Sequence, residues 1–226
     1  TPGTIWFAKD VRANEHAKKD LSSIFDGKVI FDSPKPTQLI ERIIEIATTG
    51  SESDIIVDFF AGSGTAAHAV LGVNARDGGR RKFISIQLPE ATVEDSPSHQ
   101  AGFNTIAEIS KERIRRAGQK IIGGAIHDAW NRDVGFRVLK IDSSNMTDVY
   151  YRADEVNQDE LVGQVDSIKP DRAAEDLLFQ VLLDWGVELT LSINRESLHG
   201  KTVYSVDGNT LIACFETGVT DDLVKD

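Results

Sequence analysis

The chain has 226 residues and a formal net charge of −11, from 25 Lys and Arg against 36 Asp and Glu. The charge is uneven, because residues 1–140 hold 19 basic and 18 acidic side chains whereas residues 141–226 hold 6 and 18. An acidic final third argues against a surface for phosphate backbones or anionic membranes, which need clustered Lys and Arg. The 40% hydrophobic content indicates a globular chain. No apolar run approaches the length of a membrane-spanning helix, so we expect no membrane contact.

A single cysteine, Cys214, excludes an intrachain disulfide and favours a reducing compartment, so a cytoplasmic protein is expected. Cys214 lies in an apolar strand pattern, which favours a buried structural thiol. The five histidines have neither i, i+4 spacing nor cysteine neighbours, so we expect no metal site. The chain begins Thr1-Pro2-Gly3-Thr4, without Met, which we interpret as the start of a fragment of a longer protein.

The first regular element is predicted after a pair of prolines. Residues 1–33 show no clear period and are expected to be irregular. The following segment, up to Pro36, has two prolines separated by Lys35, which hold an extended or turning backbone. Pro36 suits the first position of a helix, in which apolar residues recur at helical spacing as far as residue 47.

A strand, a glycine loop, a helix and a second strand follow. Residues 55–60 are a continuous β-branched and aromatic run, which predicts a buried strand of a parallel sheet. Residues 61–65 read Ala-Gly-Ser-Gly-Thr, residues 66–73 are predicted to be helical, and residues 82–88 form the second strand. A right-handed crossover between parallel strands makes an α/β sheet the expected architecture.

The spacing of apolar residues and the turn-forming residues between them predict the remaining elements. Residues 92–104 are expected to form a surface loop. Helices are predicted over residues 105–122 and 170–185, and strands over residues 135–141, 187–193, 202–206 and 210–215. We therefore expect an α/β core over residues 1–145 and a small α+β extension over residues 146–226.

The glycine loop is the segment that carries chemistry. Gly62 and Gly64 permit a positive φ and remove side chains from the loop, so a ligand can approach the backbone at the helix N-terminus. Asp58, at the end of the preceding strand, can accept hydrogen bonds from loop amides or from a cationic ligand.

Three kinds of glycine loop compete for this segment. A Walker phosphate loop needs a Lys directly after its last glycine, and none follows Gly64. A dinucleotide loop fits Gly62, Gly64 and Ala67, but its acidic ribose partner is replaced by Gln87. An S-adenosylmethionine loop of the form D-x-F-x-G-x-G-T is more specific. It is matched by Asp58, Phe60, Gly62, Gly64 and Thr65.

The segment Ser33-Pro34-Lys35-Pro36 followed by Asp58 to Thr65 resembles the tenth and first motifs of amino-type DNA methyltransferases. The Lys-Pro motif precedes the glycine loop, which is similar to the permuted order of the β class. The finer resemblance is to the modification (methylation) subunit of type III restriction–modification systems. It is carried along nearly the whole chain by residues 31–36, 83–90, 111–117 and 178–186.

The resemblance implies part of a Rossmann-like, S-adenosylmethionine-dependent methyltransferase core over residues 1–145, and an extension over residues 146–226 that serves subunit contacts. It implies N6-adenine methylation of double-stranded DNA by the full-length protein. It also implies a nuclease-helicase restriction subunit as partner and a homodimer of modification subunits.

The resemblance also assigns roles in the cofactor site. Lys35 would contact the methionine carboxylate, Asp58 would orient the cofactor, and Phe60 would lie near the adenine or methionine end. Gln87 would hold the ribose hydroxyls more weakly than an acid, with Glu90 as the alternative. The full set of expected cofactor-binding residues is Lys35, Pro36, Asp58, Phe59, Phe60, Gly62, Gly64, Thr65 and Gln87.

One departure from the family limits the expected activity. The family's catalytic segment reads D-P-P-Y, and these 226 residues contain no Pro-Pro. We therefore expect no catalytic residue here and an inactive chain on its own. Two other functions stay open: a non-catalytic assembly or dimerisation module of the same complex, and an NAD-type oxidoreductase. The Arg113, Arg115 and Arg116 cluster admits contact with DNA or, more commonly, a solvated helix face.

Overall fold

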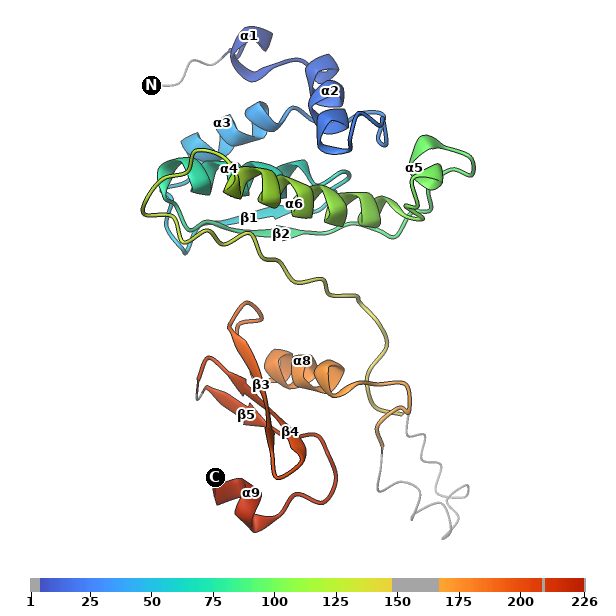
Figure 1. The fold of residues 1–226 in the computed structure, drawn as a ribbon, viewed down its shortest axis with the longest axis vertical. Helices are drawn as coiled ribbons and strands as arrows, with labels where there is room; N and C mark the ends of the chain where they lie inside the picture. Colours follow the sequence, from blue (N-terminus) through green and yellow to red (C-terminus); the bar gives the residue numbers. More distant parts are fainter. Residues whose placement is uncertain (1–4, 148–166, 209, 226) are drawn as a thin grey trace. The chain divides into compact units, whose positions relative to one another are not determined.

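The structure is a computed structural model that describes residues 5–147, 167–208 and 210–225 (Figure 1). It divides into an N-terminal unit, Thr1–Phe136, and a C-terminal unit, Arg137–Asp226. This division falls somewhat before the boundary at residue 145 that the sequence suggests.

The N-terminal unit is built around one strand–helix–strand segment. Strands β1 (Ile55–Asp58) and β2 (Lys82–Ser85) pair in parallel, with Val57 opposite Ile84, and α4 (Thr65–Asp77) connects them. The parallel pair and its helical crossover confirm that part of the prediction, although both strands are shorter than expected. The described residues of this unit contain no third strand, so a wider Rossmann-like sheet stays a proposal.

Helices cover one face of this sheet (Figure 1). Ile56 of β1 and Phe83 of β2 pack against a buried cluster that α4 shares with Ile44 of α3 (Thr37–Ala47). Helix α3 was expected, but Pro36 is its N-cap residue with ψ of 127° and Thr37 is the first helical residue. The short α/β layer therefore places the start of α3 and the start of α4 on the same side of the strands.

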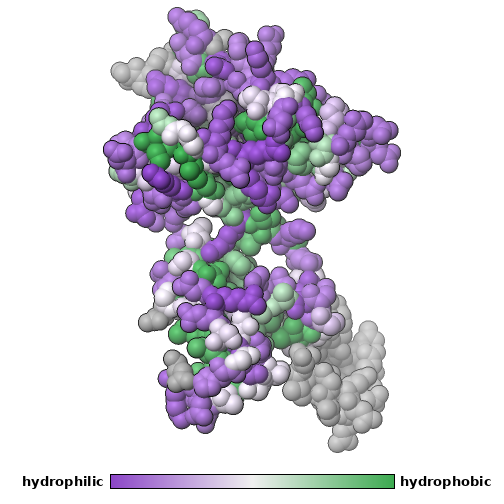
Figure 2. Space-filling model, viewed as in Figure 1, coloured by the Kyte–Doolittle hydropathy of each residue, from purple (hydrophilic) through white to green (hydrophobic). Residues whose placement is uncertain are grey.

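The opposite face of the sheet is exposed and apolar. The side chains that reach it are Ile55, Val57, Ile84 and Ile86, with 54%, 45%, 49% and 43% of their surface accessible. Figure 2 shows hydrophobic surface interspersed with hydrophilic side chains on the visible face of the N-terminal unit. The expectation that residues 55–60 form a buried strand is wrong for the residues that the structure describes. Buried parallel strands are covered on both faces of their sheet, whereas helices cover the β1–β2 pair on one face only.

Residues 1–33 are not irregular as expected. They contain α1 (Ala8–Val11) and α2 (Asn14–Ile24), and Ala17 and Leu21 on one face of α2 are buried. These two apolar residues are four apart, which is helical spacing, but the charged residues between them obscure the pattern. Leu21 belongs to a buried cluster with Ile109, which ties α2 to α6 (Ile106–Ile122).

Helix α6 is confirmed and begins with a capping box. The Thr105 side chain accepts from the backbone of Glu108, whose carboxylate accepts from the Thr105 backbone. This exchange satisfies amides that the first helical turn leaves unpaired. The expected loop before it contains a single-turn helix, α5 (Pro97–Gln100).

The strand expected over residues 135–141 does not form. The segment is extended but has no strand partner among the described residues, and Val138, Leu139 and Ile141 are exposed. Val134 and Phe136 pack against the α4–α6 cluster, and the Arg137 side chain donates to the carbonyls of Leu189 and Leu191. An apolar, extended segment with an exposed edge is consistent with a strand that needs a neighbouring strand to pair with.

The C-terminal unit packs α8 (Ala174–Asp184) on a three-stranded antiparallel sheet. The order is β3 (Ile193–Leu198), β4 (Lys201–Val206) and β5 (Leu211–Ala213). The β4–β5 hairpin was expected, whereas the predicted strand over residues 187–193 is wrong. Val187, Leu189 and Leu191 pack on the same core without joining a ladder, whereas Ile193 is the first residue of the strand, which lies later, at 193–198.

Two further observations complete the fold. Cys214 follows β5 and is half-buried, less enclosed than expected. A short helix, α9 (Asp221–Lys225), lies near the C-terminus. None of the helices in the described residues has the length and hydropathy needed to cross a bilayer.

Candidate functional site

The glycine loop begins where β1 ends. Asp58 accepts a hydrogen bond from the backbone N–H of Phe60 at 3.1 Å, which turns the chain directly after the strand. The N–H of Ala61 then donates to the carbonyl of Ile86 at 3.0 Å, so the loop remains attached to the segment after β2. Asp58 therefore supports the turn itself, which is one of the two roles that the sequence allowed for it.

Both loop glycines use left-handed backbone conformations, as predicted. Gly62 has φ of 51° and Gly64, the N-cap of α4, has φ of 78°. A Cβ on Gly64 would lie 2.7 Å from Oγ of Ser110 on α6, whereas a Cβ on Gly62 would meet nothing nearer than 3.6 Å. Gly64 is thus required by packing as well as by backbone geometry. No side chain caps the N-terminus of α4, so its first amides are available to a ligand.

A cavity of about 730 Å³ opens between this loop and the Lys35 segment. One wall carries Ser33, Pro34 and Lys35 ahead of α3. The opposite wall runs from β1 through the loop to the first turn of α4. Five of the expected site residues line it: Lys35, Asp58, Phe60, Gly62 and Thr65. The structure therefore brings the two motifs, which lie far apart in the sequence, to one cavity.

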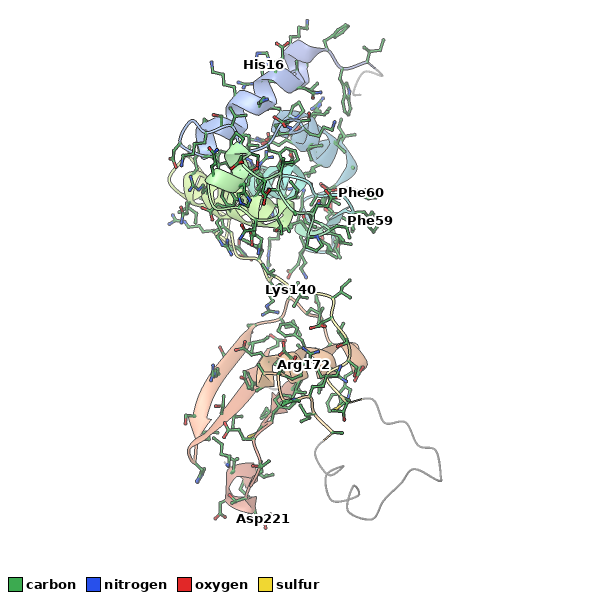
Figure 3. The ribbon with its side chains drawn as sticks, turned by 90° about the vertical axis from the view of Figure 1, so that its right-hand side faces the viewer. His16, Phe59, Phe60, Lys140, Arg172 and Asp221 are labelled. Carbon is green, nitrogen blue, oxygen red and sulfur yellow. The ribbon has the colours of Figure 1, made fainter. Side chains whose placement is uncertain are left out.

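Four expected residues do not line this cavity. Pro36 is fully buried as the N-cap of α3, and Gly64 is buried beneath the loop. Phe59 projects from the edge of the unit with 66% of its surface accessible, close to Phe60 at 88% (Figure 3). Phe60, which lines the cavity, thus presents an exposed ring, and the exposed ring of Phe59 lies beside it but outside the cavity lining.

Gln87 lies behind the loop. Its Oε1 accepts the backbone N–H of Gly62 at 2.7 Å and its Nε2 donates to the carbonyl of Leu88 at 3.2 Å. Both ends of its amide are therefore engaged within the protein. A ribose contact by Gln87 stays a proposal. Such a contact requires the Gln87 amide to bind the ligand and to support Gly62 at the same time.

The residue that the sequence reasoning missed is Arg113. Only 2% of its surface is accessible, so it faces neither DNA nor solvent. Its guanidinium donates to Oγ of Ser63 and Oγ1 of Thr65 at 2.8 Å, and to Oγ1 of Thr37 at 3.0 Å. One side chain of α6 thus joins the glycine loop to the first residue of α3. The available signal was spacing, since Arg113 is four residues from the buried Ile109 and so lies on the apolar face of α6.

His68 completes the surroundings of Arg113. Both Nε and Nη2 of the guanidinium lie 3.4 Å from Nδ1 of His68. Burial, together with the positive charges of Arg113 and Lys120, lowers the pKa of His68 to about 3, so its imidazole is neutral and accepts at Nδ1. Burial also lowers the pKa of Arg113, to about 10, which leaves the guanidinium charged at neutral pH.

The other two arginines of the cluster are held in ion pairs. Arg116 bonds Glu112 at 2.7 Å and Asp26 at 2.8 Å, and Arg115 lies 3.7 Å from Glu112. Arg115 also lies over the ring of Phe136. For Arg115 and Arg116, these contacts agree with the more common of the two expected roles, a solvated helix face.

The chemistry of the cavity is mixed. Its apolar side is supplied by α3 and β1, with Ile40, Ile44 and Ile56 among the lining residues, and Phe60 stands at its rim. Its polar groups are a cation, a carboxylate, the uncapped start of α4 and four hydroxyl side chains, those of Ser33, Thr48, Ser63 and Thr65. Such a cavity suits a ligand with an aromatic ring and a charged tail, because apolar walls take the ring while a few placed polar groups fix the tail.

Comparison with known proteins agrees with this arrangement. Residues 1–98 match the family described as DNA methylase. Over 128 residues the chain is 44% identical to the type III restriction-modification enzyme StyLTI Mod subunit of Salmonella typhimurium, covering 57% of this chain and 19% of that protein. Over 138 residues it is 34% identical to the EcoPI Mod subunit of Escherichia phage P1, covering 61% of this chain and 20% of that protein.

A type II relative is also similar. Over 100 residues the chain is 37% identical to the type II methyltransferase M.KpnI of Klebsiella pneumoniae, covering 44% of this chain and 23% of that protein. The matched part thus spans only about a fifth of the length of these relatives. Residues 1–98, which contain both walls of the cavity, match the DNA methylase family, and the chain is similar to modification subunits of type III restriction–modification enzymes.

Proposed function

We propose that the chain is the S-adenosylmethionine-binding part of a DNA adenine-N6 methyltransferase of the type III modification kind. The observation that carries this proposal is the cavity in which the Lys35 segment faces the Asp58–Thr65 loop. A volume of about 730 Å³ lies within the range of about 300–1,000 Å³ usual for small-molecule and cofactor sites. The family match over residues 1–98 supports the same conclusion.

The residues present fit this cofactor. Lys35 offers a cation to its carboxylate, and the glycine loop brings uncapped backbone amides to the same cavity. The apolar wall and the Phe60 ring suit an adenine. When bound, S-adenosylmethionine supplies a methyl group on a positively charged sulfur. The chain's own task is to bind that donor and to hold its sulfonium at the mouth of the Gly62–Thr65 loop.

The catalytic groups belong, in this proposal, to residues outside the 226. The sequence contains no D-P-P-Y segment to hold the adenine amine. The exposed apolar sheet face, with Val57 and Ile84 at its centre, supports the same view, because parallel sheets are normally covered on both faces. A further layer over β1 and β2 would complete the core and bring the catalytic segment to the cavity, where a flipped adenine would attack the methyl group in line.

The partners follow from the same proposal. Double-stranded DNA would be bound through other parts of the full-length protein, and the restriction subunit and a second modification subunit would be its protein partners. The acidic C-terminal unit would then face away from the duplex, since phosphate backbones need clustered Lys and Arg.

The C-terminal unit supports a second, structural role in assembly. It has its own core, and at the end of α8 Leu183 and Trp185 expose 64% and 69% of their surfaces. Exposed large apolar side chains of this kind are typical of a contact with another protein. Light scattering at several concentrations would show a dimer that Trp185→Ser weakens. A monomer at all concentrations would contradict self-association.

The enzymatic proposal is tested by methyl transfer. Duplex DNA is incubated with radiolabelled S-adenosylmethionine and either the 226-residue chain or a longer protein that joins it to a D-P-P-Y segment. We expect label in DNA adenine with the longer protein alone, and loss of that label when Asp58 is replaced by Ala. Transfer by the 226-residue chain alone would contradict the proposed division of the site.

A further inference from the structure

Arg113 is a buried cation whose hydrogen-bond partners are all neutral. Its guanidinium donates to the hydroxyls of Ser63, Thr65 and Thr37, and it lies beside the neutral imidazole of His68. All three hydroxyl residues are themselves buried. Buried charges in proteins are normally paired with an opposite charge, because an uncompensated one carries a large desolvation penalty. Among the described residues, no carboxylate hydrogen-bonds the Arg113 guanidinium. Burial lowers its pKa, and Asp20, which is itself paired with Arg12, opposes this only through its electrostatic attraction. The guanidinium therefore has no bonded counter-charge beside a cavity that can admit an anion.

The direction of these hydrogen bonds shows where that charge would lie. A hydroxyl oxygen that accepts from a guanidinium keeps its own proton to donate elsewhere. Ser63 and Thr65 both accept from Nη1 of Arg113, and both line the cavity. Their protons are therefore available on the cavity side, polarised by the charge behind them.

The Lys35 segment lines the same cavity. Lys35 lines it directly, and Thr37, two residues further on, is held by Nη2 of Arg113. Arg113 consequently fixes the relative position of the two walls while it raises the positive potential between them. The Lys35 cation, the two donating hydroxyls and the uncapped start of α4 together favour an anion in this cavity, against the single carboxylate of Asp58, which also lines it.

We propose that Arg113 is a positioning residue for the ligand's carboxylate, acting through the Ser63 and Thr65 hydroxyls. This inference rests on the proposed function, because the only anionic group of S-adenosylmethionine is the carboxylate of its methionine part. Arg113 does not contact the ligand itself. It selects ligands that carry the carboxylate over ligands that carry only the adenosine part.

The test compares a ligand that has this carboxylate with one that has only the adenosine part. Calorimetric titration of the 226-residue chain is carried out with S-adenosylmethionine and with methylthioadenosine, which lacks the aminobutyrate chain and with it the carboxylate, the amine and the positive charge on sulfur. We expect Arg113→Gln to weaken S-adenosylmethionine about 10- to 100-fold, since hydrogen bonds involving charge are lost. The affinity for methylthioadenosine should change less than about threefold. Arg115→Gln, which removes an exposed arginine of the same helix, is the matched control and should alter neither affinity.

Two further variants keep the test decisive if Arg113→Gln fails to fold. Ser63→Ala retains the buried cation but removes one donor, and it should also weaken S-adenosylmethionine selectively. Arg113→Lys retains the charge without the planar fork and should recover part of the selectivity. An equal loss of affinity for both ligands would contradict the proposed role of Arg113 but not the proposed function. The same conclusion follows if neither Arg113→Gln nor Ser63→Ala weakens the binding of S-adenosylmethionine. Failure of the unaltered chain to bind either ligand contradicts the proposed function and, with it, this inference.

Discussion

The backbone N–H of Gly62 donates to Oε1 of Gln87 at 2.7 Å, so the segment after β2 holds the glycine loop that follows β1. Replacement by Ala leaves this part-buried amide without its acceptor. We expect Gln87→Ala to lower the free energy of unfolding by about 1–2 kcal/mol, measured by urea denaturation.

Gln87→Glu is the matched variant, because a carboxylate can still accept from Gly62. It should retain the stability of the unaltered chain and, if residue 87 also reaches the ribose, bind S-adenosylmethionine more tightly. Equal stability of Gln87→Ala and the unaltered chain would contradict the supporting role. Equal cofactor affinity of the Glu and Gln forms would count against the ribose contact.

The two loop glycines should respond differently to alanine. Both have a positive φ, which costs an alanine about 1–2 kcal/mol. Only Gly64 has Oγ of Ser110 at 2.7 Å and the Ser110 carbonyl at 3.2 Å from the position of the new Cβ. Gly64→Ala should therefore be more destabilising than Gly62→Ala by about 1–3 kcal/mol in thermal and urea unfolding. Ser110→Ala should rescue part of the Gly64→Ala loss, and equal effects of the two glycine changes would contradict this packing.

His68 should make the chain unstable in mild acid. Burial and neighbouring positive charges lower its pKa from 6.5 to about 3 in the folded state, so the unfolded chain binds a proton there that the folded chain does not. Stability is then full above pH 6.5 and falls as the pH drops below it, by about 1.4 kcal/mol per pH unit at most.

In the pH window from 6.5 to about 4.5 Asp77 stays ionised, because the opposing effect of burial is outweighed by its hydrogen bonds to Arg81 and to the Gly79 backbone, which lower its pKa. Urea unfolding at several pH values measures the slope. His68→Gln should flatten it, and a variant that keeps the full slope would show that another group is responsible.

The two faces of the β1–β2 sheet should tolerate substitution differently. Phe83 packs against α4 on the covered face, whereas Ile84 is 49% exposed on the other face. In the 226-residue chain we expect Phe83→Ala to cost about 2–4 kcal/mol and Ile84→Thr less than about 1 kcal/mol. In a longer protein that contains the catalytic segment, Ile84→Thr should cost about 1–3 kcal/mol more than in the short chain. An unchanged cost would indicate that this face stays exposed.

The parts of this structure that depend on local sequence were predictable. Gly62 and Gly64 between a β-branched run and a helix predict the turn, because the backbone requirement is satisfied by residues within the loop itself. The capping of α6 by Thr105 and Glu108 is local in the same sense. Lys35 was placed near the loop through family resemblance, since nothing in its own neighbourhood specifies a contact across the cavity.

The parts that depend on distant partners were not predictable. Residues 135–141 and 187–193 have strand-like patterns of apolar residues. A strand forms only where a neighbouring strand pairs with it, and the local pattern does not show whether such a neighbour exists. The strand at 193–198 is polar, and its pairing with β4 decides its structure. Arg113 was interpreted by its charge together with Arg115 and Arg116, although its spacing from Ile109 placed it on the buried face.

The central claim is that the cavity between the Lys35 segment and the glycine loop binds S-adenosylmethionine. Calorimetric titration of the 226-residue chain with S-adenosylmethionine and with NAD tests it directly. The account predicts saturable binding of S-adenosylmethionine at one site per chain, at least tenfold weaker binding by Lys35→Met, and no heat from NAD. Binding of NAD in preference to S-adenosylmethionine, or no loss of affinity in Lys35→Met, would contradict it.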